Sequence, residues 1–170
     1  MISDAGRYIK LLKQIILLLS LFIATKTEAQ EPPPRPIRIY LVQDLSFGAF
    51  YQGPSGGTIT IDPSGLRSST GDIIPLNLGY LYFPATFEVH AHPGTVISIL
   101  NGPNTVLTGT PSGSMTMQIG SSIPSSPFVS TVHFNVGIPL YIGGTLIVGS
   151  PAANPPGTYT GTFEITLVRE

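Results

Sequence analysis

Glycine and proline interrupt this chain at intervals of roughly eight to twelve residues, and this spacing is the strongest limit on its fold. Between the interruptions apolar residues alternate with polar ones, so that each short run offers one apolar face to a core. From residue 30 onward, no window of helical length free of glycine and proline has a convincing helical pattern. The sequence therefore predicts an all-β fold, an immunoglobulin-like or pilin-like antiparallel β-sandwich of short strands.

The expected strands and turns can be read from the same pattern. Strands with alternating apolar residues are expected at 37–41, 58–61, 87–91, 132–136 and 159–167, and continuous apolar strands at 96–100 and 146–148. Turns rich in glycine, proline, serine and asparagine are expected at 53–57, 62–65, 101–104, 121–127 and 154–157.

The first 29 residues have the order of an export signal. Basic residues at 7, 10 and 13 lead into an apolar run at 15–24, and the small residues Thr27 and Ala29 precede a cleavage site before Gln30. A membrane-spanning helix needs ~20 apolar residues, so the short run disfavours a permanent anchor. We expect a helical signal peptide at 1–29, a stiff proline-rich tether at 30–36 and the β-sandwich at 37–170.

The part that follows the signal is acidic and contains no cysteine. Of the 8 basic and 9 acidic residues of the chain, 4 and 2 lie in the first 29, which leaves 4 against 7 and a net charge of about −3. Nucleic acid is excluded as a partner because phosphate neutralisation needs several clustered basic side chains. Without cysteine there is neither a disulfide nor a thiolate metal site, so one apolar core must hold the fold.

Residues that could carry chemistry lack the surroundings that the chemistry needs. The segment 53–57, Gly-Pro-Ser-Gly-Gly, has the letters of a nucleophile elbow, but that motif lies between a strand and a helix, and here a strand follows. His90, His92 and His133 could together bind zinc, but we expect His90 and His92 to point outward to water. We therefore expect no enzyme, no cofactor and no bound metal.

Two aspartates and an arginine lie close together in the segment 62–72. Two carboxylates are too few for calcium, which takes six to eight oxygen ligands. We expect Asp62, Arg67 and Asp72 to form a structural loop, in which Arg67 pairs with one of the aspartates and holds the loop closed.

Five segments, in order, carry a family resemblance: 44–50 (Asp-Leu-Ser-Phe-Gly-Ala-Phe), 56–67, 84–89, 142–148 and 157–163. They resemble the bacterial exported family catalogued as domain of unknown function 4402, over roughly residues 39–168. The resemblance implies an exported β-sandwich with a looser similarity to spore coat U and common-pilus-like modules, which assemble fimbriae. It implies no enzymatic activity.

Two functions of different classes follow. The first is a structural module of the cell envelope or surface, such as a fimbrial-type subunit, that assembles with itself or with other envelope proteins. The segment 37–42 would then be a strand-exchange segment, with Ile37, Ile39 and Leu41 facing a groove while Arg38 and Tyr40 face outward.

The alternative is a monomeric secreted β-sandwich that binds carbohydrate or protein through its loops. The segment 37–42 would then pair within its own sheet, and Tyr51, Tyr80, Tyr82 and Tyr141 would be candidates for stacking on sugar rings. In both cases we expect an exported protein, located in the periplasm, on the outer surface or outside the cell.

Overall fold

The computed structural model describes residues 9, 12–14, 36–110 and 112–170. The chain divides into two compact units, 1–34 and 35–170. In the first unit residues 9 and 12–14 are helical, and the rest of the expected signal peptide, like the expected tether up to residue 35, lies outside the described residues. None of the helical residues described belongs to an apolar helix with the length that a bilayer crossing requires.

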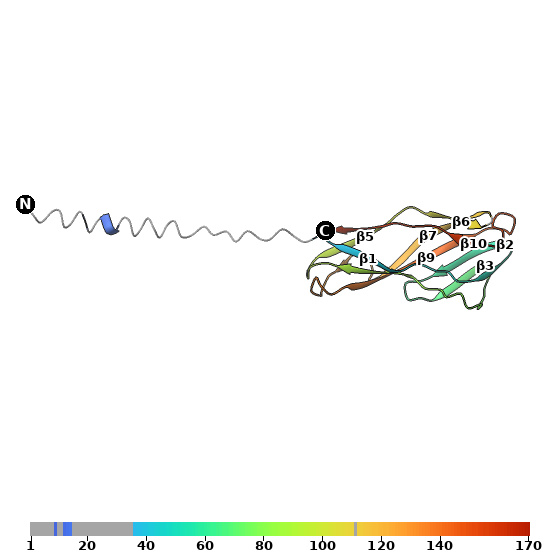
Figure 1. The fold of residues 1–170 in the computed structure, drawn as a ribbon, viewed down its shortest axis with the longest axis horizontal. Helices are drawn as coiled ribbons and strands as arrows, with labels where there is room; N and C mark the ends of the chain where they lie inside the picture. The colour runs from blue at the N-terminus through green and yellow to red at the C-terminus, as the bar shows by residue number, and fades with distance from the viewer. Residues whose placement is uncertain (1–8, 10–11, 15–35, 111) are drawn as a thin grey trace, which may run out of the picture. The chain divides into compact units, whose positions relative to one another are not determined.

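The second unit is an antiparallel β-sandwich, which confirms the expected fold class (Figure 1). A large sheet of eight strands lies against a small sheet of three. The large sheet contains β1 (Arg38–Gln43), β2 (Phe50–Ile61), β3 (Arg67–Pro75), β4 (Ala85–His90), β6 (Thr105–Thr110), β7 (Ser114–Ile123), β9 (Ile138–Val148) and β10 (Thr158–Thr160). The small sheet contains β5 (Val96–Asn101), β8 (Phe128–Val129) and β11 (Ile165–Arg169).

β9 is the central strand of the large sheet. Along one side its first half pairs with β4 and its second half with β2, while β7 pairs with it along the other side. The change of partner falls at Gly143, where a Cβ atom would lie 2.5 Å from the backbone oxygen of Ile61, so the close approach requires glycine. Beyond β4 lies β1 and beyond β2 lies β3, which makes β1 and β3 edge strands of the same sheet.

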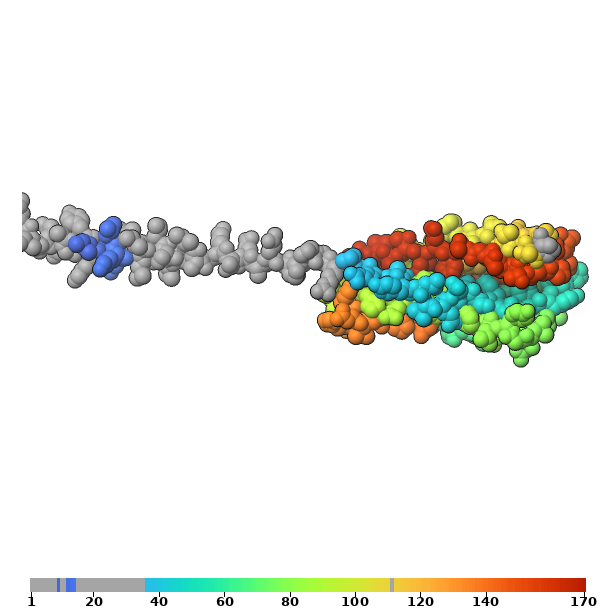
Figure 2. Space-filling model, in the orientation of Figure 1, coloured from blue at the N-terminus to red at the C-terminus, as the bar shows by residue number. Residues whose placement is uncertain are grey.

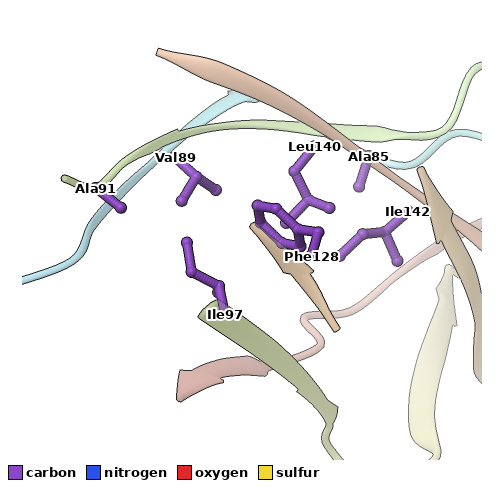
Figure 3. Packing of buried hydrophobic residues seen from close by; sticks show 7 residues of the cluster. All are labelled: Ala85, Val89, Ala91, Ile97, Phe128, Leu140 and Ile142. Atoms are coloured by element: carbon purple, nitrogen blue, oxygen red, sulfur yellow. The ribbon is translucent and has the colours of Figure 1, made fainter. Parts of the chain in front are cut away.

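Two clusters of buried side chains form the core. Figure 3 shows the first, in which Ile97 and Phe128 of the small sheet face Val89, Leu140 and Ile142 of the large sheet. The second cluster joins β2, β3, β7 and β9 through Ile59, Ile73, Met115, Met117, Leu146 and Val148. Each buried aliphatic side chain contributes about 1.5–3 kcal/mol, which gives a chain without cysteine its stability.

Alternation along β2 follows the expected pattern. Ile59 and Ile61 are fully buried on one face. On the other face the hydroxyl of Thr58 lies 2.7 Å from that of Thr70, and the hydroxyl of Thr60 lies 2.9 Å from that of Thr145. The two-residue period therefore places apolar side chains in the core and threonines on the outer face.

The prediction of a turn at 53–57 is wrong. β2 runs through this segment, and its pairing with β3 passes from Gln52 opposite Ile73 to Gly57 opposite Gly71, so the residues 53–56 form an extended bulge opposite Asp72 alone. Gly56 has a φ of +65°, and a Cβ atom there would lie 2.3 Å from the oxygen of Val148. Glycine and proline interrupt the hydrogen-bond ladder here without ending the strand.

The prediction of a strand at 132–136 is also wrong, because this segment is a turn. The N–H of Val136 donates to the oxygen of His133 at 2.8 Å, and Phe134 is buried while Val136 is exposed. A loop that folds one aromatic ring onto a sheet gives the same alternation in sequence as a strand.

The run expected at 159–167 is one strand in the sequence pattern but two in the structure. Its ends belong to β10 and β11, which lie in different sheets. The break falls at Gly161, where a Cβ atom would lie 2.6 Å from the side chain of Leu107. A glycine inside an alternating run here marks the crossing of the chain from one sheet to the other.

Candidate functional site

The first strand of the domain carries exposed apolar side chains along a free edge. Within residues 36–110 and 112–170, β1 pairs with β4 alone, so in this part of the chain its other side has backbone N–H and C=O groups without a strand partner. The exposed fractions are 39% for Ile39, 51% for Tyr40, 58% for Leu41 and 62% for Val42. We call this strand, residues 38–43, the β1 edge.

The side chains of the β1 edge alternate between two faces. Ile39 and Leu41 lie opposite Val89 and Phe87 of β4, which places them on the core side of the sheet, and Ile37 packs against the first core cluster. The segment that contains Ile37, Ile39 and Leu41 is therefore paired within its own chain, and one row of its apolar side chains borders the core. The opposite face carries Arg38 and Tyr40.

On that opposite face, β1 rests on His90 and Phe134. The ring of Tyr40 meets that of His90 edge-on at 5.5 Å, and the guanidinium of Arg38 lies 5.5 Å from the centre of the Phe134 ring. The Nε2 of His90 lies 2.8 Å from Glu88 Oε1, and its Nδ1 lies 2.9 Å from the backbone oxygen of Phe134. Both partners accept hydrogen bonds, so both bonds form together when the ring carries two protons.

Arg67 joins three separate segments of backbone. Its Nη1 donates to the oxygens of Phe47 and Ala49, and its Nη2 to the oxygen of Leu76, all at 3.3 Å. Its guanidinium also lies 4.1 Å from the centre of the Tyr82 ring, within the range of a cation–π contact. Arg67 thus fixes the segment before β2 and the segment between β3 and β4 to the start of β3.

The expected ion pair of Arg67 with an aspartate is not formed. The carboxylate of Asp62 accepts hydrogen bonds from Ser64 and Leu66, and that of Asp72 accepts one from the N–H of Ser55 at 3.1 Å. Arg67 and Asp72 both belong to β3, and an odd separation along a strand places them on opposite faces. Only Asp62, of the three, lies in the turn, and among the described residues Arg67 forms no ion pair.

Asp62 closes the turn between β2 and β3. Its Oδ1 accepts the hydroxyl of Ser64 at 2.6 Å, the N–H of Ser64 at 2.8 Å and the N–H of Leu66 at 2.9 Å. The Ser64 hydroxyl, followed by the Leu66 N–H, stabilises the charged carboxylate and holds the pKa of Asp62 below its ordinary value.

A second exposed apolar surface lies between β3 and β4. The exposed fractions are 64% for Leu78, 70% for Tyr80, 73% for Leu81 and 43% for Tyr82. We call these four residues the apolar tip. The sequence signal that could have identified the leucines is the run 73–87, which contains no charged residue.

The four tyrosines proposed as sugar-stacking residues divide between elements. Tyr80 and Tyr82 lie together in the apolar tip. Tyr51 lies on β2 opposite Ile74, and Tyr141 lies half-buried on β9. The sequence could not show this division, because it depends on the pairing of the strands.

The histidines do not form a metal site in the described part of the chain. His90 and His92 lie near the same ring, that of Phe134, at centroid distances of 6.1 and 5.5 Å. His92 is exposed, as expected, whereas His90 is half-buried by its bonds to Glu88 and Phe134. Among the residues described, no three histidine, aspartate or glutamate side chains are grouped to hold a metal ion.

A shallow hollow of about 260 Å³ lies beside β5 and β7. It is lined by Ile99, Asn101, Gly120, Ser121, Ser122, Ser125 and Ser126. None of these side chains is an acid or a base that titrates near neutral pH, so the hollow offers hydroxyl and amide groups without a general acid or base.

The comparison with protein families agrees with the structure. The family model of a domain of unknown function (DUF4402) matches residues 37–168. Searches of curated proteins and of solved structures gave no match. The matched range contains the whole of the β1 edge and of the apolar tip and nearly all of the sandwich, and on this ground the chain belongs to the DUF4402 family.

Proposed function

We propose that this protein is an exported, non-enzymatic structural module of the bacterial cell envelope or surface, of the fimbrial-subunit type. It associates with neighbouring subunits through the β1 edge. The export-signal order of residues 1–29 supports the location. The observation that carries the association is the exposure of Ile39, Tyr40, Leu41 and Val42 on a strand with a free edge.

A strand with these properties is suited to accept another strand. An incoming strand gains backbone hydrogen bonds from the edge and covers side chains on both faces. Proteins that remain monomeric protect such edges with lysine, proline, β-bulges or inward-pointing charge. The β1 edge has Arg38 at its start and a shift of register between Leu41 and Gln43 at its end, and between them its side chains are apolar or aromatic.

Native mass spectrometry over a range of concentrations tests the association. The full chain should form oligomers, and Leu41→Lys should shift it to monomer because a charge then lies on the edge that the incoming strand must cover. Val106→Lys on β6 is the matched control, since Val106 is exposed to 61% and lies away from β1 in the pairing order. It should leave the oligomers unchanged.

Two outcomes contradict the proposal. Monomer at every concentration removes the association itself. Oligomers that persist in Leu41→Lys and are lost in Val106→Lys place the association on another strand.

A second candidate is a monomeric secreted domain that binds carbohydrate or protein through its loops. Two observations favour it. The segment 37–42 pairs with β4 within its own sheet, as this function predicts, and Tyr80 and Tyr82 are exposed together on one segment. Its test is a glycan array probed with the purified chain, in which loss of signal in Tyr80→Ala supports it and the absence of any signal counts against the carbohydrate version.

A further inference from the structure

The apolar tip projects from the domain. Figure 2 shows the segment around residue 80 extending beyond the neighbouring strands at the lower edge of the view. Gly79 has a φ of +82°, and a Cβ atom added there would meet no atom within 4 Å. The surface at this point is therefore convex.

Hydrogen bonds fix the backbone on both sides of the tip. Before it, the N–H of Leu76 donates to the oxygen of Ala49 at 2.9 Å, and the oxygen of Leu76 accepts from Arg67. After it, Phe83 and Ser46 exchange two backbone hydrogen bonds, both at 3.0 Å. Because the segment is held at both ends, binding at the tip does not have to order a loose loop.

The composition of the tip selects its partner. The run 73–87 has no charged side chain and so offers a charged ligand no ion pair, and the Tyr82 ring is already in contact with the guanidinium of Arg67. Sugar rings need hydroxyl and amide partners as well as aromatic faces, and Leu78 and Leu81 offer neither. Leucine beside tyrosine is instead typical of the boundary between water and lipid, where aliphatic groups enter the acyl region and phenol hydroxyls stay among the headgroups.

We infer that the apolar tip inserts into the interface of a lipid bilayer with neutral headgroups. Leu78 and Leu81 enter the outer acyl region, and the hydroxyl of Tyr80 stays at the level of the headgroups. A bilayer deforms around a convex group, whereas a partner protein would need a matching pocket. The net negative charge of the segment that follows the signal makes a neutral surface the better match than an anionic one.

A tryptophan reporter tests the insertion in the full chain. The protein has no tryptophan, so Leu81→Trp places a single reporter in the tip. Its emission should shift to shorter wavelength when phosphatidylcholine vesicles are added, and brominated acyl chains should quench it. Val106→Trp on β6 is the matched control and should keep its emission, even if another part of the chain binds the vesicles.

A second set of variants separates the contribution of the leucine. In the Leu81→Trp background, Leu78→Ser should raise the lipid concentration that gives half of the emission shift by at least about tenfold. The reason is that burial of a leucine side chain in lipid contributes that much to the partition coefficient. Thermal melting checks that this exposed substitution leaves the fold intact. In the same Leu81→Trp background, Leu41→Lys should keep the full emission shift with vesicles. Failure of this inference and failure of the proposed association are therefore distinguishable.

The inference is overturned if Leu81→Trp emission is unchanged with phosphatidylcholine vesicles. A shift that occurs only with vesicles containing phosphatidylglycerol also overturns it, since charge would then drive the contact.

Discussion

β1 and β3 are both edge strands of the large sheet, and each begins with an arginine. Arg67 at the start of β3 is half-buried, donates to three backbone oxygens and stacks on Tyr82 at 4.1 Å. Arg38 at the start of β1 is exposed and lies 5.5 Å from the Phe134 ring. The same residue type thus anchors one edge to the body of the domain and leaves the other edge at the surface.

The two strands differ along their length as well. β3 continues with serine, threonine, glycine and aspartate, then with Ile73, which is buried, and Ile74, which is exposed, and it ends at Pro75, which cannot donate to a ladder. β1 continues with Ile39, Tyr40, Leu41 and Val42, all exposed. Since the same sheet ends at β3 in a strand with only one large exposed apolar side chain, the fold does not require an edge as apolar as β1. This contrast supports the proposed association at the β1 edge.

The largest expected effect on stability is at β3, the edge strand that Arg67 holds to the body of the domain. Arg67→Ala should lower the free energy of unfolding by about 2–3 kcal/mol, because three backbone oxygens lose a charged donor and Tyr82 loses its cation–π partner. Thermal denaturation should show a fall in Tm of roughly 5–10 °C.

Arg38→Ala is the matched control for Arg67 and should cost less than about 1 kcal/mol, as expected for an exposed cation–π contact. Arg67→Lys should recover part of the loss, since lysine keeps the charge without the planar set of donors. Equal costs for Arg67→Ala and Arg38→Ala would remove the contrast between the two edges.

The sequence pattern correctly predicted the strands and turns whose structure depends only on residues nearby in the sequence. The alternation at Ile59 and Ile61 and the turn at 62–65 were readable because a two-residue period and a turn-forming Asp-Pro-Ser-Gly need no distant partner. The failures at 53–57, 132–136 and 159–167 have another origin. There, contacts with distant segments decide the structure. They make a bulge of the expected turn at 53–57, a turn of the expected strand at 132–136, and two strands in different sheets of the expected strand at 159–167.

The candidate site could likewise be predicted only where it depends on local sequence. The face of β1 that carries Ile39 and Leu41 follows from alternation, and β4 then places it on the core side. The contacts of Arg67 could not be read, because its acceptors are the backbone oxygens of Phe47, Ala49 and Leu76, which no side chain marks in the sequence. An aspartate nearby in sequence was the wrong partner because strand geometry turns Asp72 away.

A smaller effect is expected at the support of β1. His90→Ala should lower the free energy of unfolding by about 1–2 kcal/mol, since the bonds to Glu88 and Phe134 are lost on a half-buried face. Because Tyr40 rests on His90, hydrogen exchange measured by mass spectrometry should quicken over residues 38–42 more than over β3. His92→Ala is the control, and equal quickening in both variants would show that His90 does not support β1.

The smallest effect concerns the turn that leads into β3, and it depends on pH. The pKa of Asp62 is lowered in the folded chain by the hydroxyl of Ser64 and then by the N–H of Leu66, so the carboxylate stabilises the fold fully above the ordinary aspartate range, about pH 4. That contribution is lost as the pH falls through the lower folded pKa. The difference in Tm between the protein and Asp62→Asn should therefore be constant from neutral pH to about pH 5 and shrink below about pH 4. Ser64→Ala removes the largest cause of the shift and should reproduce most of this change, whereas a difference in Tm that grows on acidification would show that the Asp62 carboxylate destabilises the turn.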